Sequence, residues 1–175
     1  MTESKVPGND GPATPKKGDQ KTLAGARHVI YTLSEMQSAL DYVLDQAKAR
    51  TGSLMLMDSG SQRLRITAAR GFSGEIIEQV KGLELAAGEG IAGHVYKTGE
   101  PYYLKDSRTD PQFVDQMLPI NPRFQFLSLP LCDDKQTVVG VLNIHFPTER
   151  ILSSQDLEAL RQTASELVID HLALG

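Results

Sequence analysis

Apolar and polar side chains follow a helical period at the two ends of this chain. Between residues 36 and 47 the apolar positions recur every three or four residues, as in a helix with one buried face. Ser34 and Gln37 have the spacing of a capping box, and Gly52 is expected to end the helix. Residues 153–172 carry a similar pattern, with a leucine stripe typical of a packed or coiled seam.

Four apolar or alternating runs in the middle of the chain predict strands. Residues 53–58 and 63–71 flank a short Ser-Gly-Ser loop, and residues 124–132 and 137–146 flank the polar turn Asp-Asp-Lys-Gln. Each pair is therefore expected to form an antiparallel hairpin. Hairpins combined with helices at both ends describe an α+β sandwich.

A glycine-rich stretch, GEGIAGHVYKTGEPYYLKD at 88–106, separates the two hairpins. It lacks the Gly-Lys-Ser/Thr ending of a phosphate-binding loop, and no clear strand leads into it as the dinucleotide fingerprint requires. We expect its first glycines to permit a turn, 91–97 to form a short helix and Gly99 to end that helix with positive φ. An extended strand then follows over 101–106, and a further short helix is expected over 74–82.

These segments together resemble the GAF domain family. The resemblance is carried by GEGIAGHVYKTGEPYYLKDSRTDPQF, LSLPL, VVGVLNIHFP and the terminal helical pattern, and it covers residues 34–172. It implies a central antiparallel sheet of five or six strands, with the terminal helices on one face and ligand-pocket loops on the other. It also implies a sensory or regulatory role in signal transduction. Homodimers are expected through the helices at 34–50 and 153–172, because the apolar stripe of the C-terminal helix is too wide for one sheet face to cover.

Composition and charge indicate which partners and which cellular location to expect for such a domain. The chain has 175 residues and a formal net charge of −4; residues 1–22 contribute four lysines against three acids, so the remainder carries −5. That charge disfavours direct nucleic-acid binding. The chain contains no apolar run of membrane-spanning length and no signal peptide, so no membrane partner and a cytoplasmic location are expected. Residues 1–22 are predicted to be a disordered leader before a single domain over 23–175.

Several GAF subclasses can be tested against particular residues. The Asn-Lys-Phe-Asp-Glu signature of cyclic-nucleotide-binding members is missing from this sequence. The single cysteine, Cys132, ends a predicted strand, whereas bilin-binding members use a cysteine on the pocket loops. Free methionine sulfoxide reductases of this fold work through several cysteines. The preferred interpretation is a non-catalytic sensory domain; a small enzyme of the reductase type and a pure dimerisation module remain as alternatives.

The candidate ligand-binding residues follow from alternation in the last strand. Leu142, Ile144 and Phe146 should face the helices, which leaves Asn143 and His145 on the opposite, pocket-facing side. Three segments distant in sequence are then expected to converge on one pocket, and no cofactor is identified by them. The full candidate set is His94, Asp106, Asp110, Phe113, Phe126, Asn143 and His145.

Each of these residues has a simpler interpretation. Asp106 and Asp110 are common turn-forming residues, aromatic residues in strands are usually core, and the two histidines could be ordinary half-exposed side chains. With Asp106 or Asp110, the histidines could also act as metal or haem-edge ligands, although no metal site is assigned.

Overall fold

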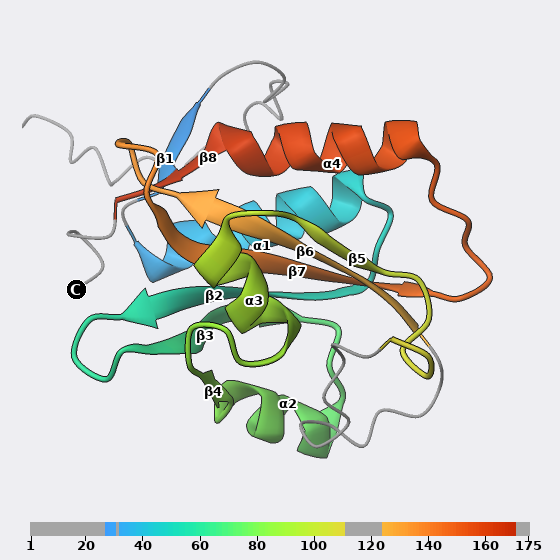
Figure 1. Cartoon of the computed structure of the whole chain (residues 1–175), viewed down its shortest axis with the longest axis horizontal. Helices are drawn as coiled ribbons and strands as arrows, with labels where there is room; N and C mark the ends of the chain where they lie inside the picture. The colour runs from blue at the N-terminus through green and yellow to red at the C-terminus, as the bar shows by residue number, and fades with distance from the viewer. Residues whose placement is uncertain (1–26, 31, 111–123, 171–175) are drawn as a thin grey trace, which may run out of the picture.

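The computed structural model describes residues 27–30, 32–110 and 124–170. The predicted leader over 1–22 and the candidate Phe113 lie outside the described residues. Figure 1 shows a sheet packed between two sets of helices. In chain order the elements are β1 (His28–Ile30), α1 (Leu33–Gln46), β2 (Thr51–Asp58), β3 (Arg63–Arg70), α2 (Gly74–Lys81), β4 (Glu84–Leu85), α3 (Gly90–Thr98), β5 (Tyr102–Leu104), β6 (Phe124–Cys132), β7 (Val138–Pro147), α4 (Ser154–Glu166) and β8 (Leu167–Ile169).

The described strands form one sheet in the order β1-β8-β6-β7-β2-β3-β4, with β5 paired to β6 off this path. The predicted hairpins β2–β3 and β6–β7 are confirmed, and β7 also pairs antiparallel with β2. The sheet has eight strands rather than the predicted five or six. Strands of two or three residues at its edges make up the difference, since they are too short to show a period of two. The sheet is also mixed, because β8 pairs in parallel with both β1 and β6.

The two terminal helices differ from their predicted boundaries. The capping box of α1 is formed by Thr32 and Glu35 rather than by Ser34 and Gln37: the Glu35 amide donates to Thr32 Oγ1 over 3.2 Å, and the Thr32 amide donates to Glu35 Oε2 over 2.9 Å. Gly52 does not end this helix but lies inside β2. A Cβ atom there would lie 2.6 Å from the Asn143 carbonyl oxygen, so close strand packing requires the glycine.

The last helix ends at Glu166, and the three residues that follow form β8 instead of continuing to residue 172. Leu167 already has extended backbone angles, and Leu167–Ile169 is buried throughout. The apolar run therefore gains more from pairing with neighbouring strands than from continuing a helix, in keeping with the strand preference of Val and Ile.

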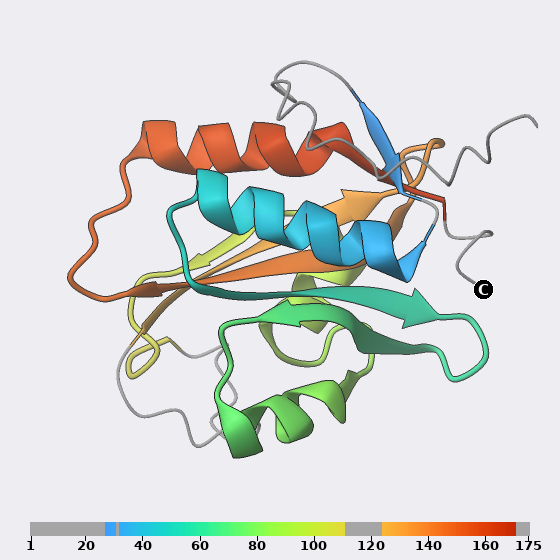
Figure 2. The same ribbon diagram turned by 180° about the vertical axis from the view of Figure 1, so that it is seen from behind.

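The helices are divided between the two faces of the sheet. α1 and α4 lie side by side on one face, as Figure 2 shows, and α3 packs on the opposite face. The predicted alternation of β7 is confirmed, because Leu142, Ile144 and Phe146 join the core beneath α1 and α4, whereas Val141 joins the core beneath α3.

The leucine stripe of α4 faces into the domain's own core. Leu160 in α4 is 5% exposed, and Leu167, which was predicted to continue the stripe but lies in β8, is 4% exposed. The stripe is thus covered by the domain itself, and the width argument for a dimer seam is wrong.

Of the described helices, none is both long and apolar enough to cross a lipid bilayer.

Candidate functional site

A cavity of about 770 Å³ opens at the end of the sheet where β2 and β6 begin and β7 ends. Its walls come from the α1–β2 connection, the start of α2 with the turn before it, and the exit of β7 towards α4. The lining residues are 48–51, 71–73, Ile76, Arg108, Phe124 and 145–149. Of the predicted site residues that the structure describes, His145 lines this cavity.

The His145 ring sits among three phenylalanine rings. Ring centroids lie 4.7 Å from Phe126, 5.1 Å from Phe124 and 5.7 Å from Phe72, and the Phe126 and Phe72 contacts are edge-on. Burial lowers the pKa of His145 to about 4, so the imidazole is neutral at neutral pH. The structure therefore brings two predicted residues, Phe126 and His145, into direct contact. Phe72 was missed, and nothing in its local sequence signals this contact.

Asn143 lies in a buried polar row that crosses three strands. Ser128 on β6 donates its hydroxyl to Asn143 Oδ1 over 2.8 Å, and Asn143 Nδ2 donates to Ser53 Oγ on β2 over 3.3 Å. The Asn143 side chain is 3% exposed. These bonds give the amide a structural role, since buried polar groups need partners. Its assignment to a ligand site stays a prediction.

His94 and Asp110 meet through a residue that the sequence analysis did not single out, Tyr102. The Tyr102 hydroxyl donates to Asp110, with distances of 2.8 and 2.9 Å to the two carboxylate oxygens, and its ring lies edge-on to His94 at 5.9 Å. Burial, together with the Asp110 carboxylate, raises the pKa of Tyr102 to about 12. Alternation along β5 was a usable signal, because Tyr102 and Leu104 share the α3 side while Tyr103 packs on the other.

Asp106 closes a turn, as its simpler interpretation predicts. Its Oδ1 accepts from the Arg108 amide over 3.0 Å, and its carbonyl accepts from the Thr109 amide over 3.2 Å. This turn holds the backbone of Arg108 at the cavity wall.

Across the described ranges, no group of three or more His, Cys, Asp or Glu side chains is arranged to hold a metal ion. Neither His94 nor His145 therefore belongs to such a group among the described residues.

Arg150 connects the cavity wall to the terminal helices. Its guanidinium donates to the carbonyl oxygens of Ala47 and Lys48, the latter over 3.1 Å, at the C-terminal end of α1. The guanidinium carbon also lies 4.8 Å above the centre of the Phe146 ring. A cation at this end of α1 is favourable for the helix dipole. The β7–α4 connection is thereby fastened to the α1–β2 connection, a link that no sequence pattern reveals.

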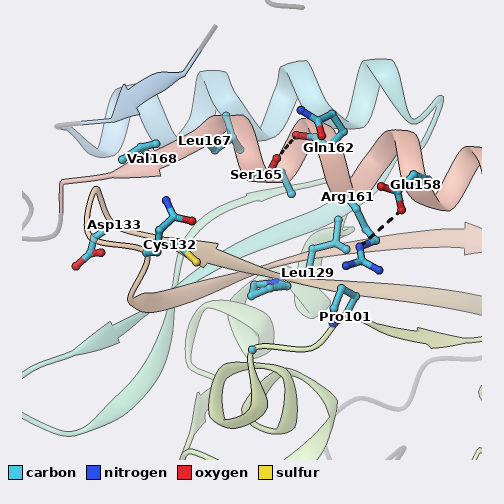
Figure 3. A pocket seen from close by; sticks show the side chains of 14 residues that line it. Pro101, Leu129, Cys132, Asp133, Glu158, Arg161, Gln162, Ser165, Leu167 and Val168 are labelled. Atoms are coloured by element: carbon cyan, nitrogen blue, oxygen red, sulfur yellow. Dashed lines mark hydrogen bonds and ion pairs between the residues drawn. The ribbon is translucent and has the colours of Figure 1, made fainter. Parts of the chain in front are cut away.

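A smaller cavity of about 270 Å³ lies between α4 and β6 (Figure 3). Cys132 lines it together with Leu129, Arg161 and Leu167. Burial, with a smaller contribution from Asp133, raises the pKa of the Cys132 thiol. Cys132 and Phe124 are the two ends of β6, which separates the thiol from the larger cavity by about 26 Å of strand.

The sequence model of the GAF domain matches residues 34–169. The chain belongs to the GAF domain family. A relative by sequence is the Nif-specific regulatory protein of Azotobacter vinelandii, 26% identical over 128 residues, which are 69% of this chain and 24% of that protein. This GAF domain therefore resembles a region of a longer regulatory protein and spans about a quarter of its length.

Solved structures give the same fold. The GAF domain of an Acinetobacter phosphoenolpyruvate-protein phosphotransferase matches with a TM-score of 0.62 and 23% identity, covering 77% of this chain and 78% of that one. The type II free methionine-R-sulfoxide reductase of Thermoplasma acidophilum matches with a TM-score of 0.56 and 16% identity, covering 78% and 94%. A GAF domain of a phosphotransferase and a sulfoxide reductase thus share this architecture, so the fold alone does not show whether this domain is catalytic.

Proposed function

We propose that this GAF domain is a non-catalytic sensory domain in which a small molecule binds beside His145 and its presence is passed to α1 and α4. The observation that carries the proposal is the make-up of the cavity wall. Residues 48–51 lead out of α1, residues 145–149 lead towards α4, and both line the cavity. A ligand that orders or displaces either connection acts directly on a terminal helix.

Arg150 supports the transmission step because it joins these two connections. Its hydrogen bonds to Ala47 and Lys48 join the connection that leads to α4 to the connection that follows α1, so a displacement of one is expected to move the other. The similarity to part of a regulatory protein agrees with this role, in which the domain controls a further signalling domain or protein in the cytoplasm.

The chemistry of Cys132 supports a non-catalytic role over a reductase. The sequence contains a single cysteine, whereas the reductases of this fold are expected to need another thiol to resolve the first. A raised pKa also leaves less of the nucleophilic thiolate at neutral pH. Cys132 moreover lies at the far end of β6 from the cavity beside His145.

A thermal-shift screen of nucleotides, amino acids, tetrapyrroles and divalent metals tests the sensory proposal. We expect a compound that stabilises the fold by about 2.7 kcal/mol at a hundredfold excess over its dissociation constant. His145→Ala should abolish the shift. His94→Ala is the matched control, because His94 lies outside the lining of this cavity.

Two results would count against the proposed site. A shift lost with His94→Ala but kept with His145→Ala moves the site to the His94–Tyr102–Asp110 cluster. A screen without any His145-dependent shift leaves the dimerisation module as the better account.

We also propose that two copies of this domain associate through the outward faces of α1 and α4, which no described element covers (Figure 2). Ala159 is exposed on α4, so Ala159→Arg should weaken the dimer, whereas Gln79→Arg on the exposed side of α2 should not. Sedimentation at high micromolar concentration should show a wild-type dimer. A monomer under those conditions contradicts the proposal. Charges at Leu160 or Leu167 would not test it, because both are buried in the core.

A further inference from the structure

The cavity beside His145 is bordered by an excess of positive charge. Among the lining residues that the structure describes, Lys48, Arg50 and Arg108 stand against a single acid, Glu149. This local balance is opposite in sign to the chain as a whole, whose formal net charge is −4. Positive side chains around a concave surface raise the local concentration of anions.

The two arginines of the cavity also differ from four other arginines of the domain. Arg63, Arg65, Arg70 and Arg161 each form an ion pair with a carboxylate. Within the described part of the chain, neither Arg50 nor Arg108 forms such a pair. Their guanidinium groups therefore keep the paired donors that suit a carboxylate or a phosphate.

The backbone under both arginines is held in place by hydrogen bonds. Arg108 follows the turn closed by Asp106, whose Oδ1 accepts from the Arg108 amide over 3.0 Å. Arg50 follows Ala49, whose carbonyl accepts from Arg70 Nη2 over 3.0 Å. An ordered backbone lowers the loop-ordering cost of binding an anion, although the exposed side chains of both arginines still lose rotamer freedom when they bind.

The same cavity also has apolar and aromatic lining. Phe72, Phe124 and Ile76 line it, and His145 adds a ring that is neutral at neutral pH. Flat rings stack well on such a surface. A ligand that used both the positive and the aromatic lining residues would carry a flat apolar body and a negative group.

We infer that the cavity takes a flat, apolar organic anion, such as an aromatic carboxylate, with its ring against Phe72, Phe124 and His145 and its charge against Arg50 and Arg108. This inference rests on the proposed sensory function and specifies the chemical class of the ligand. According to this inference, the domain distinguishes its ligand from other flat molecules by the ligand's negative group.

Two probes of nearly equal shape separate charge from stacking. Indole-3-acetate carries the negative group, and indole-3-acetamide replaces it with a neutral amide. The chain has no tryptophan, so the fluorescence anisotropy of either indole can be followed by exciting it at wavelengths longer than those that tyrosine absorbs. We expect the acetate to bind about tenfold more tightly than the amide, as charge-assisted bonds require.

Arg50→Gln and Arg108→Gln should each weaken acetate binding about tenfold while leaving binding of the amide unchanged. Arg65→Gln is the matched control, because Arg65 is exposed, pairs with Glu84 and lies outside the cavity lining. The thermal midpoints of all three variants verify that they are folded. Added salt should weaken binding of the acetate alone.

Equal affinity for the two probes, or acetate binding that survives the double replacement of Arg50 and Arg108, overturns the inference. So does the failure of both probes to bind. The sensory function is judged separately, by whether any compound of the wider screen gives a His145-dependent shift. An uncharged compound that does so would retain the function and reject the anion.

Discussion

Replacing Phe146 with alanine is expected to lower the free energy of unfolding by about 4 kcal/mol. Phe146 is 1% exposed and belongs to the core beneath α1 and α4. Alanine removes most of that buried apolar surface and leaves a hole that the surrounding strands fill only in part. The same ring also supports the Arg150 guanidinium at 4.8 Å, so its loss loosens the bonds between Arg150 and the end of α1. Equilibrium unfolding in urea measures the change.

Two variants make the Phe146 experiment interpretable. Ile151→Ala, at a side chain that is 91% exposed, should change stability by less than about 0.5 kcal/mol. Phe146→Leu keeps most of the volume and should cost about 1 kcal/mol, so it gives a measurable value even where Phe146→Ala does not fold. A loss below about 1.5 kcal/mol for Phe146→Ala would show that this end of the sheet relaxes around the hole.

The long elements were predictable because their patterns are sustained. The runs that became β6 and β7 extend over nine and ten residues, enough for alternation to identify which side faces α1 and α4. The helix predicted over 74–82 is confirmed as α2, and the one predicted over 91–97 as α3. Gly99 ends α3 with a φ of 72°, as expected.

The boundaries and edges were not predictable from local patterns. A strand of three residues such as β8 carries no period, and its conformation is decided by β1 and β6, which lie far away in the sequence. The sequence analysis therefore continued the last helix through Leu167. The capping box of α1 was misplaced because Ser34 and Gln37 fit the capping pattern as well as Thr32 and Glu35 do.

Of the candidate site, the sequence could predict only the residues that strand alternation places. Alternation indicates that Asn143 and His145 face away from the helices, but it does not show that Asn143 is bonded to two buried serines. The cavity itself depends on the α1–β2 and β7–α4 connections, where hydrophobic patterns carry little information. Arg50, Arg108 and Arg150 resemble any other surface arginine until the fold places them.

Acidification is expected to destabilise the domain through His145. The imidazole has a pKa of about 4 in the folded state, against an ordinary value of 6.5, because burial disfavours its charged form. Between these values the unfolded chain binds a proton that the folded chain does not. The free energy of unfolding therefore falls as the pH is lowered from 6.5 towards 4, and above 6.5 His145 imposes no such penalty. The full loss amounts to about 3 kcal/mol.

His145→Gln separates this contribution from the carboxylates, which titrate in both proteins. Glutamine does not ionise, so the stability of the wild type relative to the variant should be constant above pH 6.5 and should decrease by about 3 kcal/mol down to pH 4. The His145 ring proton signals should titrate in the folded protein near pH 4 when followed by NMR. A midpoint near 6.5, with a pH-independent difference between the two proteins, would mean that water reaches the ring freely and that the three phenylalanines do not enclose it.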